Sequence, residues 1–152
     1  MLSIGSLAPA ISLPDSHDVT QTLASFVGHK VFVYFYPRAS TPGCTQQGCA
    51  LQTALSEGEI SNVVVLGISP DKPAALAKFS QKYGFEFLML SDVDHSVAEA
   101  NGAWGQKKNY GKEYMGIVRS AVLIDEHGMV AKVWPAISPK TTVSELVTAL
   151  GE

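Results

Sequence analysis

The stretch VFVYFYPRASTPGCTQQGCALQTALSEG, residues 31–58, joins two elements of different kinds through one short loop. Its first six residues are all apolar or aromatic, as expected for a strand buried on both faces of a sheet. After the loop, Thr41 suits the N-cap of a helix, Pro42 suits the first helical position, and Gly58 suits the helix end. The stretch therefore predicts a buried strand followed directly by a helix.

The rest of the chain continues this alternation of strands and helices. We expect an irregular entry with a hairpin over residues 1–27 and a solvated loop at 107–112. The residues 125–128, DEHG, suit a hairpin turn. Further strands are predicted at 63–68, 85–90, 120–125 and 129–134, and further helices at 71–84, 96–102 and 141–151. The order predicts an α/β fold: a mixed central β-sheet with helices on both faces, in a single domain over residues 1–152.

Composition and charge narrow the class of protein. The chain has 152 residues, of which 46% are hydrophobic and 16% are charged, with a net charge of −3. A chain of this length can bury about 70% of its unfolded surface without a disulfide or a metal. The net negative charge does not favour nucleic acid or an anionic membrane as a partner. No apolar run is long enough to cross a bilayer, and the N-terminus lacks a signal-peptide pattern.

We therefore expect a cytoplasmic protein. Thiols are kept reduced in that compartment, so its two cysteines, Cys44 and Cys49, are expected to be free or catalytic rather than a structural bridge.

Cys44 falls in the first turn of the predicted helix. Backbone N–H groups there lack intrahelical acceptors and carry partial positive charge, which stabilises a thiolate, the reactive form of cysteine. Lowering the pKa of a cysteine thiol from about 8.5 to about 6 requires roughly 3.4 kcal/mol. A helix end contributes at most about 2 kcal/mol. A cation must therefore assist. The chain has two arginines, Arg38 on the same loop and Arg119 before the strand at 120–125, and the pattern alone does not choose between them.

The spacing between the two cysteines limits whether they can form a disulfide. Residues five apart in a continuous helix differ by about 7.5 Å in rise and point roughly 140° apart. A disulfide needs Cα atoms within about 7 Å. Cys44 and Cys49 can therefore pair only if the helix unwinds locally. Gly48, which we place at an exposed position, weakens the helix by roughly 1 kcal/mol and favours such opening.

Other interpretations of the cysteines stay open at this point. Cys49 can be a small buried helix residue, and Cys44 can be inert. A zinc site is disfavoured, because thiolate ligands to zinc are usually two to four residues apart with further cysteine or histidine nearby. The histidines have no such spacing (His17, His29, His95 and His127). A thioredoxin-type site would need C-x-x-C, and a Cys–His hydrolase would have no local signature here.

Four stretches together resemble one known family. They are PRASTPGCT (37–45), LGISPDKP (66–73), MLSDVDHSVAEANGAWG (89–105) and GIVRSAVLIDEHGMV (116–130). This set closely resembles the peroxiredoxins of the Q type, also called bacterioferritin-comigratory proteins, along nearly the whole chain. The resemblance implies a thioredoxin-like fold and thiol peroxidase activity. Departures are Gln52-Thr53, where many relatives have Arg-Asp, and Ala121, where threonine is frequent.

The resemblance also implies roles for individual residues. Pro37, Thr41, Cys44 and Arg119 match the active-site positions of the family, and Cys49 matches the resolving cysteine. Arg119 and first-turn amides would hold the peroxide, Thr41 Oγ would bond the thiolate or the peroxide, and Pro37 would shield the sulfur.

The expected cycle reduces hydrogen peroxide and organic hydroperoxides. It passes through a sulfenic acid on Cys44 and an intramolecular Cys44–Cys49 disulfide, which thioredoxin or a similar dithiol recycles. No metal, flavin or heme is required. We expect a monomer, since the chain stops two residues after Leu150. The alternatives are a protein thiol–disulfide oxidoreductase, which would not turn over peroxide, and a redox-sensing or holdase-type binding module, which would oxidise without turnover.

Overall fold

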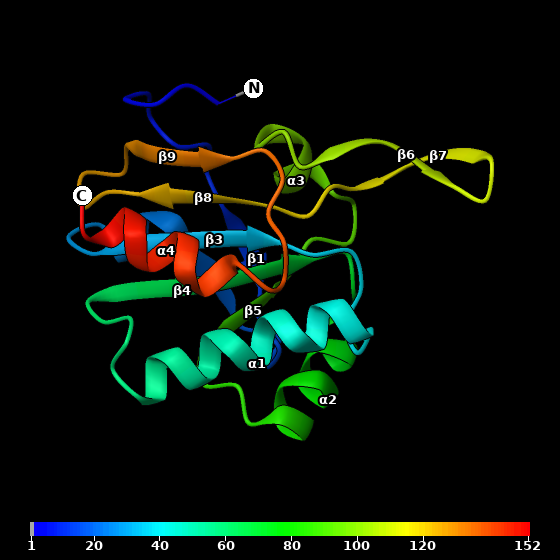
Figure 1. The fold of residues 1–152 in the computed structure, drawn as a ribbon, viewed down its shortest axis with the longest axis horizontal. Helices are drawn as coiled ribbons and strands as arrows, with labels where there is room; N and C mark the ends of the chain where they lie inside the picture. Colours follow the sequence, from blue (N-terminus) through cyan, green and yellow to red (C-terminus); the bar gives the residue numbers. More distant parts are fainter. Residues whose placement is uncertain (1) are drawn as a thin grey trace.

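A computed structural model describes residues 2–152 and places a five-stranded mixed sheet at the centre of this part of the chain (Figure 1). The strand order is β5-β4-β3-β8-β9, with β3 in the middle. β3 pairs in parallel with β4 and antiparallel with β8. The strands are β3 (Lys30–Phe35), β4 (Val63–Ser69), β5 (Leu88–Ser91), β8 (Ser120–Ile124) and β9 (Val130–Trp134). The mixed sheet predicted from the sequence is thereby confirmed.

The central position of β3 follows from its unbroken apolar sequence. Every side chain from Val31 to Phe35 is buried. Because successive side chains point to opposite faces of a sheet, Phe32 and Tyr34 enter one core, whereas Val33 and Phe35 enter the other. A strand with apolar residues at every position can occupy only a site that is covered on both sides.

Helices cover both faces of the sheet, as predicted. The face that carries Phe32 and Tyr34 is covered by α1 (Pro42–Ser56), α2 (Pro73–Tyr83) and α4 (Thr142–Leu150). The opposite face is covered by α3 (Ser96–Ala100), by the 3-10 helix η1 (Leu23–Phe26) and by the hairpin of β1 (Ser12–Pro14) and β2 (Thr20–Thr22). This hairpin is the one expected near the N-terminus. In Figure 1, α1 and α4 lie in front of the sheet.

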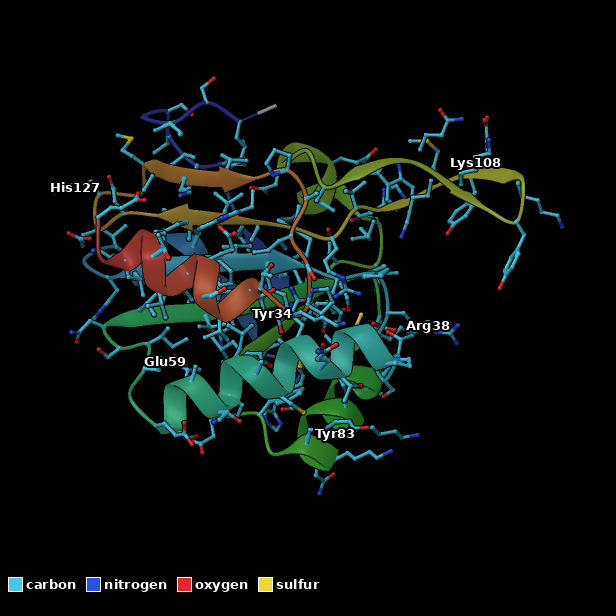
Figure 2. The ribbon with its side chains drawn as sticks, in the orientation of Figure 1. Tyr34, Arg38, Glu59, Tyr83, Lys108 and His127 are labelled. Atoms are coloured by element: carbon cyan, nitrogen blue, oxygen red, sulfur yellow. The ribbon has the colours of Figure 1, made fainter. Side chains whose placement is uncertain are left out.

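The solvated loop predicted at 107–112 is wrong. These residues belong to an antiparallel pair, β6 (Trp104–Asn109) and β7 (Lys112–Ile117), which projects from the body as an arm (Figure 1). Tyr110 (φ 51°) and Gly111 (φ 77°) make the turn at its tip. Lys108 lies on this arm, far from α1 (Figure 2). The strands escaped prediction because an arm with solvent around it has no buried face and hence no apolar alternation.

Gly48 is buried, so its expected exposed position is also wrong. A Cβ atom added at Gly48 would lie 2.6 Å from Cζ of the Phe85 ring. The missing side chain thus lets Phe85 pack directly on the backbone of α1. The strand predicted at 85–90 begins later in the structure: β5 starts at Leu88, and Phe85 packs against α1 before it.

We expect Gly48→Ala to destabilise the protein, although alanine favours a helix by about 1 kcal/mol over glycine. Overpacking of a core typically costs about 1–3 kcal/mol, so the free energy of unfolding should fall by up to about 2 kcal/mol. Urea unfolding of the reduced protein measures this, with Gln46→Ala at an exposed position of the same helix as the control. A more stable Gly48→Ala protein would contradict the contact with Phe85.

Candidate active site

Cys44 lies at the start of α1, where the sequence predicts it. The first helical hydrogen bond runs from the Thr45 amide to the Thr41 carbonyl (2.9 Å). The amides of Gly43 and Cys44 come before that bond and have no acceptor within the helix. Cys44 is only 2% exposed, and its thiol is free. The sulfur is therefore nearly enclosed at the positive end of the helix dipole.

Arg119 is the arginine that reaches this sulfur. Its Nη2 atom donates a hydrogen bond to Sγ of Cys44 at 3.3 Å. The pairing of Phe35 with Ser120 aligns β8 with the end of β3, which places Arg119 beside the loop that leads to Cys44. Arg38, in contrast, is exposed and directed outward beyond the start of α1 (Figure 2). The fold thus decides a choice that the residue pattern left open.

Gln47 holds Arg119 in place, and the sequence did not reveal this role. Its Oε1 accepts a hydrogen bond from Arg119 Nη1 at 2.7 Å, and its Nε2 donates to Thr142 Oγ1 at 2.9 Å. Both Gln47 and Thr142 are fully buried. The available signal was the spacing: Gln47 follows Cys44 by three residues and so shares its helix face. This chain of hydrogen bonds fixes the guanidinium against the first turns of α1.

Thr41 and Pro37 lie on the loop before Cys44. Thr41 has the extended backbone of an N-cap (φ −80°, ψ 156°), but its hydroxyl makes no cap hydrogen bond. Instead it donates to the Arg38 carbonyl at 2.8 Å, a local bond that competes with capping. In this structure the hydroxyl therefore bonds within the loop, and the expected bond from Thr41 Oγ to the Cys44 thiolate or to the peroxide stays a prediction. Pro37 is half-buried and follows β3 directly.

Asp71 anchors this loop and is a second residue that the sequence did not reveal. Its Oδ2 accepts hydrogen bonds from the Ala39 amide (2.7 Å) and from Ser69 Oγ (2.8 Å). The tie joins the end of β4 to the loop after β3, two segments that lie side by side because their strands are paired.

Cys49 lies farther along α1, half-buried against the core. Its thiol is free, and burial raises its pKa. The helix is continuous from Pro42 to Ser56, so the rise between Cys44 and Cys49 keeps the two sulfurs from bonding. The structure thus brings Arg119 to Cys44 and keeps Cys49 apart.

Two buried phenols, Tyr34 and Tyr36, share the core that contains Cys44. Burial raises the pKa of both far above its usual value, so both stay neutral. The positive charge that contacts the sulfur comes from Arg119. Within residues 2–152, no cluster of three or more histidine, cysteine or acidic residues could hold a metal ion. No helix in this range combines the length and the apolarity that crossing a membrane requires.

A cysteine at a helix start and in contact with an arginine has the electropositive surroundings that are typical of a thiol-dependent redox protein. Residues 4–133 match the AhpC/TSA family, and the chain belongs to this family. It is 47% identical to peroxiredoxin Bcp of Escherichia coli over 133 residues, 88% of this chain and 85% of the relative. It is 39% identical to peroxiredoxin Bcp of Bacillus subtilis over 149 residues, 98% of this chain and 95% of the relative.

Solved structures agree with this assignment. The bacterioferritin comigratory protein of Xanthomonas campestris superposes with a TM-score of 0.87 at 31% identity, over 99% of this chain and 96% of that chain. The thioredoxin-like fold and the resemblance to Q-type peroxiredoxins are therefore confirmed.

Proposed function

We propose that this peroxiredoxin reduces hydrogen peroxide and organic hydroperoxides, with Cys44 as the attacking residue. The observation that carries the proposal is the 3.3 Å hydrogen bond from Arg119 to the Cys44 sulfur at the start of α1. The related Xanthomonas campestris protein was studied for its alkyl peroxide reduction activity, which supports organic hydroperoxides as substrates. A thiol serves as reductant, as membership of the family implies.

The geometry accounts for the first chemical step. The Cys44 thiolate attacks one peroxide oxygen, the O–O bond breaks, and negative charge develops on the leaving oxygen. The Arg119 guanidinium and the first-turn amides are donors that stabilise this charge without reorganisation, because the fold already holds them in place. Pro37 helps to limit access of water to the sulfur. Cys44 ends the step as a sulfenic acid.

Cys49 then completes the cycle in our proposal. Local opening of α1 brings the Cys49 sulfur to the sulfenic acid, and a Cys44–Cys49 disulfide forms with release of water. An external dithiol reduces this disulfide by exchange. Thioredoxin as that dithiol, the cytoplasmic location and the monomeric state stay predictions.

If α1 opens, the disulfide form should lose backbone protection over residues 44–55, because the disulfide is incompatible with a continuous helix there. Hydrogen exchange with mass spectrometry, on reduced and peroxide-treated protein, measures this difference. The strands β3 and β4 serve as the internal control and should keep their protection. Unchanged exchange over 44–55 in a confirmed disulfide form would rule out helix opening as the route.

Peroxide turnover separates this proposal from its alternatives. Consumption of hydrogen peroxide or cumene hydroperoxide in many equivalents, with a dithiol protein present, supports a peroxidase. Reduction of protein disulfides without peroxide turnover would indicate an oxidoreductase. Stoichiometric oxidation without turnover would indicate a sensor or a holdase-type module.

A further inference from the structure

The middle of α1 is tied to the segment between α2 and β5 by two contacts. The Glu86 amide donates a hydrogen bond to Oε1 of Gln52 at 2.6 Å, across 34 residues of sequence. The Phe85 ring packs against the backbone of Gly48, where no Cβ would fit. We call these four residues, Gly48, Gln52, Phe85 and Glu86, the α1 clamp.

The clamp brackets the second cysteine. Gly48 directly precedes Cys49, and Gln52 lies almost one turn after it. Unwinding that brings Cys49 toward Cys44 must move the backbone at Gly48 away from Phe85. Such unwinding also strains the hydrogen bond between Gln52 and Glu86, because Gly48 and Gln52 lie about one helical turn apart. The clamp therefore opposes the motion that disulfide formation requires.

Phe85 is held firmly by other aromatic rings and does not travel with the helix. It packs edge-on against Phe79 with ring centroids 5.0 Å apart and stacks with Phe87 at 5.1 Å. Phe79 is itself a fully buried residue of α2. The segment 85–87 is thus a fixed point on the body, and opening of α1 moves Gly48 and Gln52 away from Phe85 and Glu86.

We propose that Gln52 is a positioning residue that holds α1 closed and thereby slows formation of the Cys44–Cys49 disulfide. The proposal rests on the proposed function and deepens it. In the step concerned, the Cys49 sulfur bonds to the Cys44 sulfur and the S–O bond of the sulfenic acid breaks. The hydroxide leaves as water with the proton of the Cys49 thiol. A slower step prolongs the life of the sulfenic acid and gives a second peroxide time to oxidise Cys44 to the sulfinic acid.

Gln52→Met tests this role, since methionine has a similar length and helix propensity but a much weaker acceptor. The loss of one hydrogen bond should speed disulfide formation by roughly two- to tenfold, while peroxide attack on Cys44 stays unchanged. Rapid quenching, thiol alkylation and mass spectrometry resolve the two steps separately. The sulfinic acid fraction at high peroxide should fall in parallel.

Ser56→Ala is the matched control. It removes the hydrogen bond from Gln52 Nε2 to Ser56 Oγ (3.0 Å) and leaves the bond to Glu86 in place. Its rate of disulfide formation should stay within about twofold of the wild-type rate, because this bond joins two residues of α1 and does not tie the helix to the segment 85–87.

Hydrogen exchange on the reduced proteins gives a readout that needs no peroxide. Gln52→Met should raise exchange over residues 48–56, whereas Ser56→Ala should raise it less. An unchanged exchange rate in Gln52→Met, or disulfide formation as slow as in the wild type, would overturn the clamp. A failure of Cys44 to form any sulfenic acid would instead contradict the proposed function, and the exchange data would still decide the clamp.

Discussion

Cys44→Ser should abolish peroxide consumption. A serine hydroxyl is not ionised near neutral pH, so the helix start and Arg119 would face a group that cannot attack a peroxide oxygen. Serine is close to cysteine in size, and the fold should therefore persist around this buried position. Peroxide loss in a coupled assay with a dithiol reductant measures the effect, and the free energy of unfolding confirms that the variant is folded.

Cys49→Ser is the counterpart to this variant. It should consume about one equivalent of peroxide per chain and then stall with a dithiol protein as reductant, because the sulfenic acid on Cys44 has no partner within the chain. Its first peroxide attack should be as fast as in the wild type. If Cys49→Ser lost the first attack and Cys44→Ser kept it, the two assignments would have to be exchanged.

Arg119→Met should slow peroxide attack at least tenfold, equivalent to about 1.4 kcal/mol of barrier. The change removes the donor that lies 3.3 Å from the sulfur, together with the charge that stabilises the leaving oxygen. Stopped-flow measurement of Cys44 oxidation gives the rate directly. The stability of the variant should be measured in parallel, because Gln47 Oε1 loses its partner in the core.

Arg38→Met is the matched control for this prediction. Arg38 is the other arginine of the chain and is exposed beyond the start of α1 (Figure 2). Its loss should leave the attack rate near the wild-type value, since water screens an exposed charge. Equal losses in both variants would show that electrostatic activation is shared between the two arginines.

The sequence alone predicted the elements whose causes are local. The apolar run at 31–36 indicated a strand covered on both faces, and β3 lies at the centre of the sheet. Thr41 and Pro42 indicated where a helix begins, which placed Cys44 in the first turn of α1. These patterns succeed because strand burial and helix initiation depend on residues within one or two turns of one another.

Only the tertiary structure decided how the site is completed. Arg119 lies 75 residues from Cys44 in the sequence. The residue pattern did not distinguish Arg119 from Arg38, and only the family resemblance favoured Arg119. Gln47 reaches Thr142 across 95 residues, and the face of Gly48 is filled by Phe85. Such contacts depend on which strands pair and which helix covers them. A local pattern constrains the backbone near it, whereas these long-range partners are set by the packing of the whole sheet with its helices.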